Sequence, residues 1–556
     1  MTYDLLIKNG TVVDGTGAPR RHADVAVKDG RIVEIGAIKD GARQVTDAEG
    51  QVVCPGFFDP HTHYDAQITW DRLLSSSAEH GITSVVMGNC GVGIAPCKPQ
   101  ARELLMDDLV NVEGMDKEVL SAGINWNFET FPEYMDVAER NSGGINRAFL
   151  MPLAPLRTFV MGAEATERSA SADETRAMTA LLSEAIQAGA AGFSTTVMPS
   201  HVGHGGKPFA ARVASRDELS AYCGVLKKIG RGVIEMALTK QFSRFADDEY
   251  EMLDFMLTAS GRPVTWLSVH NLVERPGGVQ EVLAKAAPLI KRGGLPQILT
   301  RPLVADMNLR RPFQFGEMKC AKNIFDAPFE RQLAMYADPS FRNAFKEELK
   351  LGRKWNAKGI SVFKVTNPRL KAYEGSTIGD IAAKLNQDPN DVFFEIAADD
   401  NLETKYVVPR ANTDRARIPD LLNDPRTLIG LSDAGAHVDM FAEAGYTTYL
   451  LGHWVREQQA LSLEAAVKRI TADPADYFGF KDRGRLTPGA AADIVVLDAD
   501  RVGSPERASL VRDLPANGAR MVSKAEGILQ VFVNGTQLYR DGKHTGDFPG
   551  KVLRAA

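Results

Sequence analysis

The sequence lacks any uninterrupted run of about 18 apolar residues, the length a helix needs to cross a bilayer, so no membrane-spanning segment is predicted. It also lacks a surplus of positive charge, since 65 Lys and Arg stand against 71 Asp and Glu, a net charge of −6. Nucleic-acid phosphates and anionic lipids attract basic surfaces, so neither is an expected partner. Cysteine is scarce, with five residues and no disulfide-framework spacing. These absences favour a cytoplasmic protein, in which a cysteine with a specific role is a metal ligand or a buried apolar residue and not part of a disulfide.

The N-terminal stretch MTYDLLIKNG carries charges and no apolar core, so no signal peptide is predicted. Apolar residues make up 44% of the chain and charged residues 24%, which excludes a largely disordered or fibrous protein. With 556 residues, the chain exceeds one ordinary domain of about 100–200 residues. A large barrel with a smaller second domain fits this length.

The two ends of the chain resemble each other, because both contain short apolar strands around Asn-Gly or Asp-Gly turns. These segments are 4–14 (DLLIKNGTVVD), 24–35 (DVAVKDGRIVEI), 492–500 (ADIVVLDAD) and 528–543 (ILQVFVNGTQLYRDGK). Neither end alone has enough strands to bury a face against water. We therefore expect residues 1–52 and 488–556 to form one composite β-sandwich domain.

The middle of the chain alternates short apolar strands with helical segments, which is typical of βα units around a parallel sheet. The strand candidates are 52–60, 82–90, 146–153, 190–196, 232–238, 263–270, 295–303 and 427–435. Ser171 with Glu174, and Ser215 with Glu218, have the spacing of a helix capping box. Eight such strands predict an α/β fold, a (β/α)₈ TIM-like barrel over 53–487. About 120 residues separate the last two strands. We expect 304–426 to be a helical insertion over the barrel mouth.

Polar side chains follow three of these strands where they end, at the C-terminal face of the predicted barrel. His61 and His63 end the first strand, and their spacing on an extended chain directs both imidazoles to one side. Cys90 lies between glycines after the second strand, and Asp433 follows the eighth. Imidazole, thiolate and carboxylate groups bind zinc, and a carboxylate can also accept a proton from metal-activated water.

Each of these residues also has an ordinary structural explanation. The histidines could be hydrogen-bonded surface residues, Cys90 a buried thiol and Asp433 the cap of the next helix. Because four unrelated features would not be expected to meet on one face, we favour a single metal site.

Several motifs occur together along most of the chain. Among them are LLIKNGTVVDGTG, PGFFDPHTHYDAQ, HGITSVVMGNCGVGIAP, GLSDAGAH, DRGRLTPGAAADIVVLD and FVNGTQLYRDGKHTGDFPGKVLR. With them the sequence resembles the amidohydrolase superfamily and, within it, the D-aminoacylase (N-acyl-D-amino-acid deacylase) family. The resemblance implies a metal-dependent barrel with a composite β-sandwich, and hydrolysis of the amide in N-acyl-D-amino acids.

The resemblance also implies roles for four residues. His61, His63 and Cys90 would bind Zn²⁺, with Cys90 standing in for the carboxylated lysine of other amidohydrolases. Asp433 would bind the metal and be the catalytic group that takes the proton of the attacking water and returns it to the leaving amine. About one zinc ion per chain is expected.

The sequence departs from the family pattern at two expected ligands. The family places a histidine at the end of strand five, where this chain has Ala237 or Leu238, and another ending strand six, where it has Ser268 or Val269. His270 could replace the second ligand only if strand six carries a bulge, because a one-residue slip otherwise turns its side chain away.

Two further residues are candidates for binding the substrate. Arg301, at the end of strand seven, could pair with a substrate carboxylate through its forked donors. His437, four residues after Asp433, could face the cavity and hold that aspartate or a substrate.

Three hypotheses follow. The first is a metal-dependent amidohydrolase acting on N-acyl-D-amino acids or a related small amide. The second is a hydrolase or lyase of another small molecule with an altered or absent metal site, suggested by the two missing histidines. The third is a non-catalytic amidohydrolase-fold scaffold, against which the retention of His61, His63 and Asp433 argues. The expected partner is a small-molecule substrate, and self-association into a homo-oligomer is left open.

Overall fold

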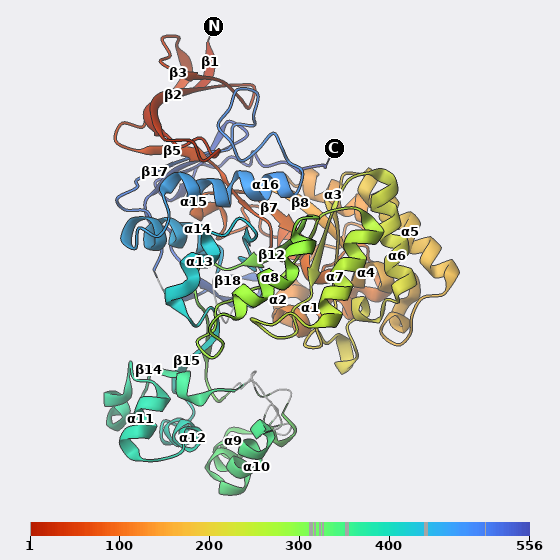
Figure 1. Cartoon of the computed structure of the whole chain (residues 1–556), viewed down its shortest axis with the longest axis vertical. Helices are drawn as coiled ribbons and strands as arrows, with labels where there is room; N and C mark the ends of the chain where they lie inside the picture. Colours follow the sequence, from red (N-terminus) through yellow and green to blue (C-terminus); the bar gives the residue numbers. More distant parts are fainter. Residues whose placement is uncertain are drawn as a thin grey trace. The chain divides into compact units, whose positions relative to one another are not determined.

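A parallel sheet of eight strands organises the middle of the chain. The computed structural model describes residues 2–310, 315, 318–321, 324, 327–350, 355–438, 443–505 and 507–555. The strands run side by side in chain order, and β7, β8 and β12 are labelled among them in Figure 1. They are β6 (Phe57–Asp59), β7 (Ile82–Met87), β8 (Asn146–Pro152), β9 (Gly192–Thr196), β10 (Val233–Ala237), β11 (Val264–Leu267), β12 (Gly294–Ile298) and β16 (Leu428–Ile429).

The first and last strands of this sheet meet beyond their carboxyl ends. Thr62 bridges Ala434 in parallel. The amide of His63 donates to the carbonyl of Ala434 at 2.7 Å, and the amide of Asp433 donates to the carbonyl of His61 at 3.2 Å. The sheet therefore curls into a TIM-like barrel, and the segments after β6 and β16 are fixed beside each other. The predicted fold class is confirmed.

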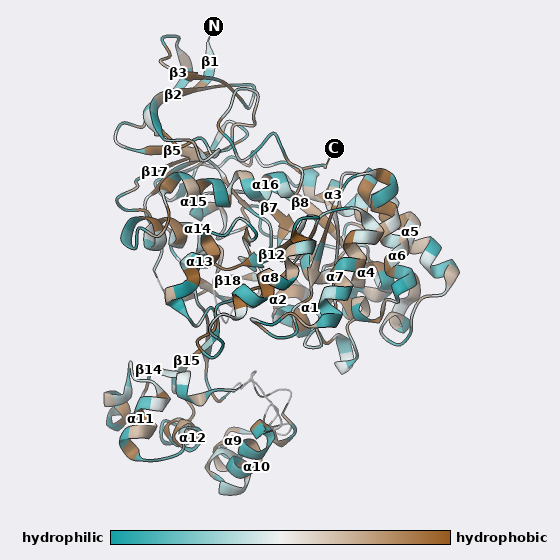
Figure 2. Cartoon of the chain, viewed as in Figure 1, coloured by the Kyte–Doolittle hydropathy of each residue, from teal (hydrophilic) through white to brown (hydrophobic). Residues whose placement is uncertain are grey.

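Helices follow the barrel strands and cover the sheet. They are α1 (Arg102–Glu113), α2 (Lys117–Gly123), α3 (Phe131–Arg140), α4 (Leu153–Met161), α5 (Ala172–Gln187), α6 (Arg216–Ile229), α7 (Asp247–Ser260), α8 (Gly278–Ile290), α13 (Ile418–Leu422), α14 (Tyr446–Tyr449), α15 (Leu463–Ile470) and α16 (Ala472–Tyr477). In Figure 2 the outer helices carry both polar and apolar residues, whereas β7 is mostly apolar. Both predicted capping boxes are confirmed, at the N-termini of α5 and α6. No helix in the described part of the chain has the length and apolar character needed to cross a membrane.

Both chain ends contribute to one nine-stranded sheet. Its strands are β1 (Tyr3–Val12), β2 (Arg21–Lys28), β3 (Arg31–Gly36), β4 (Ala42–Asp47), β5 (Val52–Pro55), β17 (Ile494–Leu497), β20 (Ile528–Val533), β21 (Thr536–Arg540) and β22 (Lys543–His544). β17 pairs with β5 and so joins the two ends. A separate hairpin of β18 (Ser509–Leu514) and β19 (Gly518–Val522) lies between β17 and β20 in sequence. We keep 1–52 and 488–556 as the proposed bounds of this domain.

The hairpins of this sheet are confirmed at Asp29-Gly30 and Asn534-Gly535, where all four residues have positive φ. The hairpin expected at Asn9-Gly10 is wrong. β1 continues through this pair, and its register with β2 shifts between Ile7 and Gly10. β1 is bordered by β2 on one side and by β4 and β5 on the other, so pairing along both edges keeps it extended.

Residues Pro302–Thr413 form a compact unit of their own. The unit contains β13 (Leu303–Met307), β14 (Ser361–Lys364) and β15 (Lys405–Ala411), which form an antiparallel sheet. Its longer helices are α9 (Phe329–Ala337), α10 (Pro339–Lys350), α11 (Ile378–Leu385) and α12 (Pro389–Asp399). The predicted insertion at 304–426 is thus not purely helical. The chain after Thr413, including α13, belongs with the barrel.

Candidate metal centre

His61 and His63 lie just beyond β6, and the backbone around them is held on both sides. Thr62 donates its amide and hydroxyl to the carbonyl of Val86, at the end of the neighbouring strand β7. The alternation of an extended chain then places both imidazoles on the same side. Their Nε2 atoms are 3.3 Å apart, and both side chains are buried. The structure thus brings the imidazoles of His61 and His63 together, as the spacing of the two residues predicts.

Cys90 follows β7 in a tight turn. Cys90 itself has φ +56°, and the neighbouring Gly88 and Gly91 also have positive φ. A Cβ on Gly88 would come within 2.1 Å of the carbonyl oxygen of Leu150, so only glycine fits there. The turn brings the Cys90 sulfur to 3.6 Å from the Nε2 of His61.

Asp433 completes the group from the segment after β16. Its Oδ1 lies 3.1 Å from the Nε2 of His63 and 3.5 Å from the Nε2 of His61. Tetrahedral N, O and S ligands at about 2.0–2.3 Å from zinc are about 3.3–3.8 Å apart. Four of the six pairs among these donors, all except His63–Cys90 and Cys90–Asp433, have distances close to this range. Among the described residues, two sets of atoms are close enough to share a cation: those of His61, His63 and Cys90, and those of His63, Glu113 and Asp433.

Carboxylates surround the two histidines. Glu235, in the middle of β10, places its Oε1 4.0 Å from the Nδ1 of His61. Glu113, the last residue of α1, places its Oε1 3.6 Å from the Nδ1 of His63. Together with Asp433 they give the pocket a surplus of acidic groups, which a divalent cation would neutralise.

The ionisation of the pocket reflects this imbalance. Burial alone would lower the pKa of His63, but the carboxylates of Glu113 and Asp433 outweigh it and raise the pKa to about 10. Burial raises the pKa of Glu235 to about 8. Burial and the nearby carboxylates of Glu235 and Glu113 raise the pKa of the Cys90 thiol. A cation at this position would reverse the effect on Cys90, because a coordinating thiol is deprotonated. The donor set therefore fits a zinc-like ion.

His270 is not brought into this group. β11 pairs with β10 and β12 without a register shift, so strand six carries no bulge to turn the side chain inward. Instead, the Nε2 of His270 hydrogen-bonds the hydroxyl of Ser268 at 2.7 Å, and its ring packs against Phe242. Ala237 and Leu238, at the end of strand five, are buried apolar residues.

The two substrate-binding candidates lie in different places. The guanidinium of Arg301 lies over the ring of Tyr449, 5.7 Å from its centroid. His437 lies beside the metal pocket: its amide donates to the carbonyl of Glu113 at 2.7 Å, and its Nε2 is 4.0 Å from the Oε2 of the same residue. Only His437 is thus placed against the candidate centre by these contacts, and substrate binding by either residue stays a prediction.

The sequence interpretation missed Glu113 and Glu235. A signal for Glu235 exists, because a single charged residue interrupts the apolar strand GVIEMAL, and strands of a parallel barrel are otherwise apolar. A buried charge of this kind is more informative than an exposed one. Glu113 has no comparable signal, since an acidic residue at the end of a helix is common on protein surfaces.

The chain is similar to known proteins over nearly its whole length. Residues 44–539 match the model of the Amidohydrolase family. An N-acyl-D-glutamate deacylase of Alcaligenes xylosoxydans xylosoxydans is 30% identical, over 99% of this chain and 96% of the relative. The D-aminoacylase of the same organism is 27% identical, over 99% of this chain and 97% of the relative. A crystal structure of N-acyl-D-glutamate deacylase from Bordetella bronchiseptica, complexed with zinc and a phosphonate inhibitor, superimposes with a TM-score of 0.66 at 27% identity and covers both chains fully.

The barrel, the metal-type donors and these matches define the class: the chain belongs to the amidohydrolase family. Within that family it falls in the branch of the D-aminoacylases.

Proposed function

We propose that this chain hydrolyses the amide bond of N-acyl-D-amino acids, or of a related small amide, with one zinc ion held by His61, His63, Cys90 and Asp433. The observation that carries the proposal is the spacing of these donors, 3.1–3.6 Å for four of their six pairs, at the C-terminal end of the barrel. The names of the relatives support the choice of substrate class. The proposed partner is a small molecule, with no role for nucleic acid or membrane.

A divalent ion bound there would supply Lewis-acid activation of water and of the acyl carbonyl. The chain itself supplies the proton acceptor. The side chain of Asp433 is 24% exposed, whereas those of His61 and His63 are at most 1% exposed. Asp433 is therefore the donor that faces the open side of the pocket, where a substrate would enter.

Asp433 is also in the right ionisation state. Burial alone would raise its pKa, but without a metal the hydrogen bonds and charge interactions with His61 and His63 hold it well below its usual range. A bound cation would favour the carboxylate in the same way. The group is thus a carboxylate at neutral pH. Because four protein ligands would fill a tetrahedral site, Asp433 would have to leave the ion to make room for water. Its Oδ could then accept a proton from the attacking water and return it to the leaving amine.

The test combines metal analysis with a substrate panel. Freshly purified protein should carry about one zinc per chain and should release carboxylic acid from N-acyl-D-amino acids. Asp433→Asn should lower kcat by about 10²–10⁴-fold, the usual contribution of a general base. Asp248→Asn is the matched control, because Asp248 is an exposed aspartate that pairs with Lys240 at the start of α7.

Two outcomes would overturn the proposal. Turnover unchanged by chelation, or full activity in Asp433→Asn, would exclude this mechanism. Turnover confined to lactones, cyclic amides or other small molecules would instead support a different hydrolase or lyase reaction.

A further inference from the structure

Each histidine of the candidate centre has a buried glutamate behind it. The two Nε2 atoms face each other and Asp433, whereas the Nδ1 atoms point to the opposite side. There the Nδ1 of His61 meets Glu235 at 4.0 Å, and the Nδ1 of His63 meets Glu113 at 3.6 Å. Both glutamates are at most 3% exposed. Two carboxylates from different elements thus occupy equivalent positions behind the two imidazoles.

The atoms between His61 and Glu235 are complementary. The Nδ1 of His61 and the Oε1 of Glu235 are both buried, and neither makes a hydrogen bond of standard geometry with the described residues. The side chain of Gln297 is another polar group near His61: burial lowers the pKa of that imidazole, and the interaction with Gln297 acts in the opposite direction. A buried polar atom without a partner is costly, and these two atoms could satisfy each other after a small approach. Such a bond would require the proton on Nδ1, which leaves the lone pair of Nε2 directed at the metal position.

The second oxygen of Glu235 already holds another part of the centre. Its Oε2 accepts a hydrogen bond from the amide of Cys90 at 2.5 Å. Glu235 is itself fixed, because its backbone is paired with Ser194 on one side and Thr265 on the other. One side chain from strand five therefore contacts the ligand segments that follow strands one and two.

Glu113 has a corresponding place on the other side. Its carboxylate lies between His63 and His437, with Oε1 toward the first and Oε2 toward the second at 4.0 Å. The carbonyl of Glu113 also accepts the amide of His437, so the end of α1 and the segment after Asp433 are tied together.

We propose that Glu235 and Glu113 are positioning residues that fix the tautomer and orientation of His61 and His63, with Glu235 also holding Cys90. The proposal rests on the metal site of the proposed function but not on its substrate. Carboxylates behind metal-binding histidines have this effect generally, and their loss costs about 10–100-fold in metal affinity. Strand five, where relatives are expected to supply a histidine ligand, here supplies a carboxylate that acts from outside the ligand set.

The test measures metal binding rather than activity. Glu235→Gln and Glu113→Gln are each titrated with zinc against a competing chelator, and with Co²⁺, whose spectrum reports the thiolate ligand. A glutamine has one acceptor oxygen, so Glu235→Gln cannot serve both the Cys90 amide and the Nδ1 of His61. We expect zinc affinity to fall about 10–100-fold in each variant, with the saturated Co²⁺ spectrum unchanged.

Glu249→Gln is the matched control. Glu249 is a buried glutamate that accepts the amides of Lys240 and Ala246, away from the donor group. Its replacement should leave zinc affinity unchanged, and melting of the metal-free variants checks that each is folded. If Glu235→Gln does not fold, Glu235→Asp and Glu113→Gln carry the test.

Unchanged zinc affinity in both glutamate variants would refute the positioning role. A saturated Co²⁺ spectrum that differs from the wild type would also refute it, because the glutamate would then be a direct ligand. Failure of the wild-type chain to bind zinc would instead refute the proposed zinc-dependent function. The outcome that refutes the positioning role is thus different from the outcome that refutes the proposed function.

Discussion

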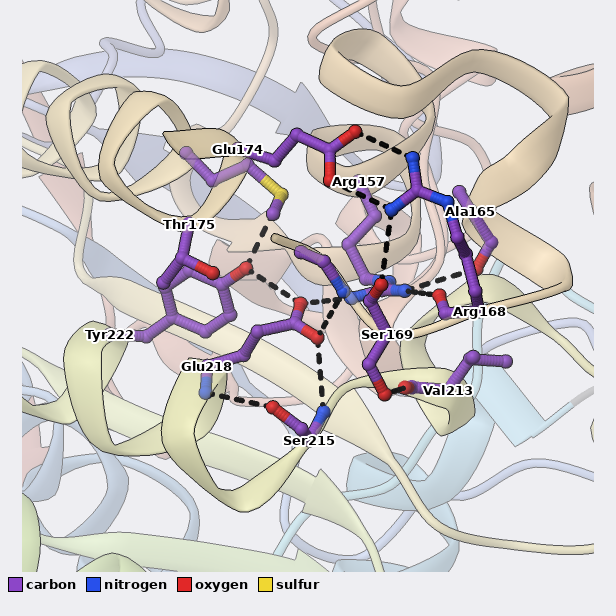
Figure 3. Close-up of polar contacts among 12 residues, drawn as sticks. Arg157, Ala165, Arg168, Ser169, Glu174, Thr175, Val213, Ser215, Glu218 and Tyr222 are labelled. Atoms are coloured by element: carbon purple, nitrogen blue, oxygen red, sulfur yellow. Dashed lines mark hydrogen bonds and ion pairs between the residues drawn. The ribbon is translucent and has the colours of Figure 1, made fainter. Parts of the chain in front are cut away.

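A buried ion pair between α4 and α6 offers the sharpest test of how the barrel is stabilised (Figure 3). Arg157 and Glu218 are paired with side chains that are at most 1% exposed. The Nη2 of Arg157 also donates to the carbonyls of Ala165 and Arg168, at 3.2 and 2.8 Å. The Oε2 of Glu218 accepts the amide of Ala170 at 3.0 Å and that of the cap residue at the start of α6 at 3.1 Å.

The substitution that tests this ion pair is Glu218→Gln, which keeps the size of the side chain and removes its charge. The guanidinium of Arg157 is then left buried without a counter-charge, and breaking such a pair costs about 3–5 kcal/mol. The glutamine oxygen can still accept one backbone amide, so the cap of α6 is only partly lost. We therefore expect the barrel unit to lose about 3–5 kcal/mol of unfolding free energy.

The assay is urea unfolding followed by hydrogen exchange of peptides from α4 and α6, which reports on the barrel separately from the unit at 302–413. Glu174→Gln is the matched control, because Glu174 also caps a helix and pairs with an arginine, Arg168, but on the surface. Its loss should be much smaller. Equal losses in the two variants would refute the reasoning, as would a double variant Arg157→Met, Glu218→Met that is no more stable than Glu218→Gln.

Three further predictions concern acid stability, metal binding and domain independence. Burial lowers the pKa of His80 to about 4. Between pH 6.5 and 4 the unfolded chain therefore binds a proton at this histidine and the folded chain does not. The free energy of unfolding should fall by up to about 3 kcal/mol as the pH is lowered through this range. His80→Gln should be less sensitive over this range in urea unfolding at pH 7 and pH 4.5, and an identical loss would contradict the assignment. Zinc at 1,000 times its Kd should stabilise the wild-type chain by about 4 kcal/mol, and Cys90→Ser should require more zinc for the same melting shift; equal requirements would exclude Cys90 as a ligand. Leu303 pairs with Ala411, so the two ends of the unit at 302–413 lie close together and a short Gly-Ser linker should be able to replace it. The barrel should then remain folded, as judged by circular dichroism. Aggregation, or loss of the barrel's melting transition, would show that the barrel does not fold independently of this unit.

The sequence allowed the meeting of these four candidate ligands to be predicted because the topology of a parallel barrel gathers its strand ends. His61, Cys90 and Asp433 are far apart in the chain, yet each directly follows a recognisable apolar strand. Their convergence follows from the eight-stranded order and does not require knowledge of side-chain contacts. Glu113 could not be found in this way, because its place depends on how α1 packs against the barrel.

The errors in the fold have a common physical cause. Asn9-Gly10 carries a strong local turn signal, but pairing of β1 on both edges outweighs it. The apolar run 52–60 was predicted as one strand, whereas it divides at Gly56 into β5 of the terminal sheet and β6 of the barrel. The run 295–303 likewise divides into β12 and the start of β13. Apolar periodicity indicates a strand but not the sheet in which it pairs.

The pairing of β5 with β17 has a consequence for how the protein is made. The edge of β5 that accepts β17 is complete at Pro55, but its partner begins only at Ile494, after the whole barrel has been translated. At about 5–20 residues per second, a ribosome needs roughly 20–90 s to cover that distance. During this interval the edge of β5 that pairs with β17 has no partner, and an unpaired strand edge is a place where another chain can pair.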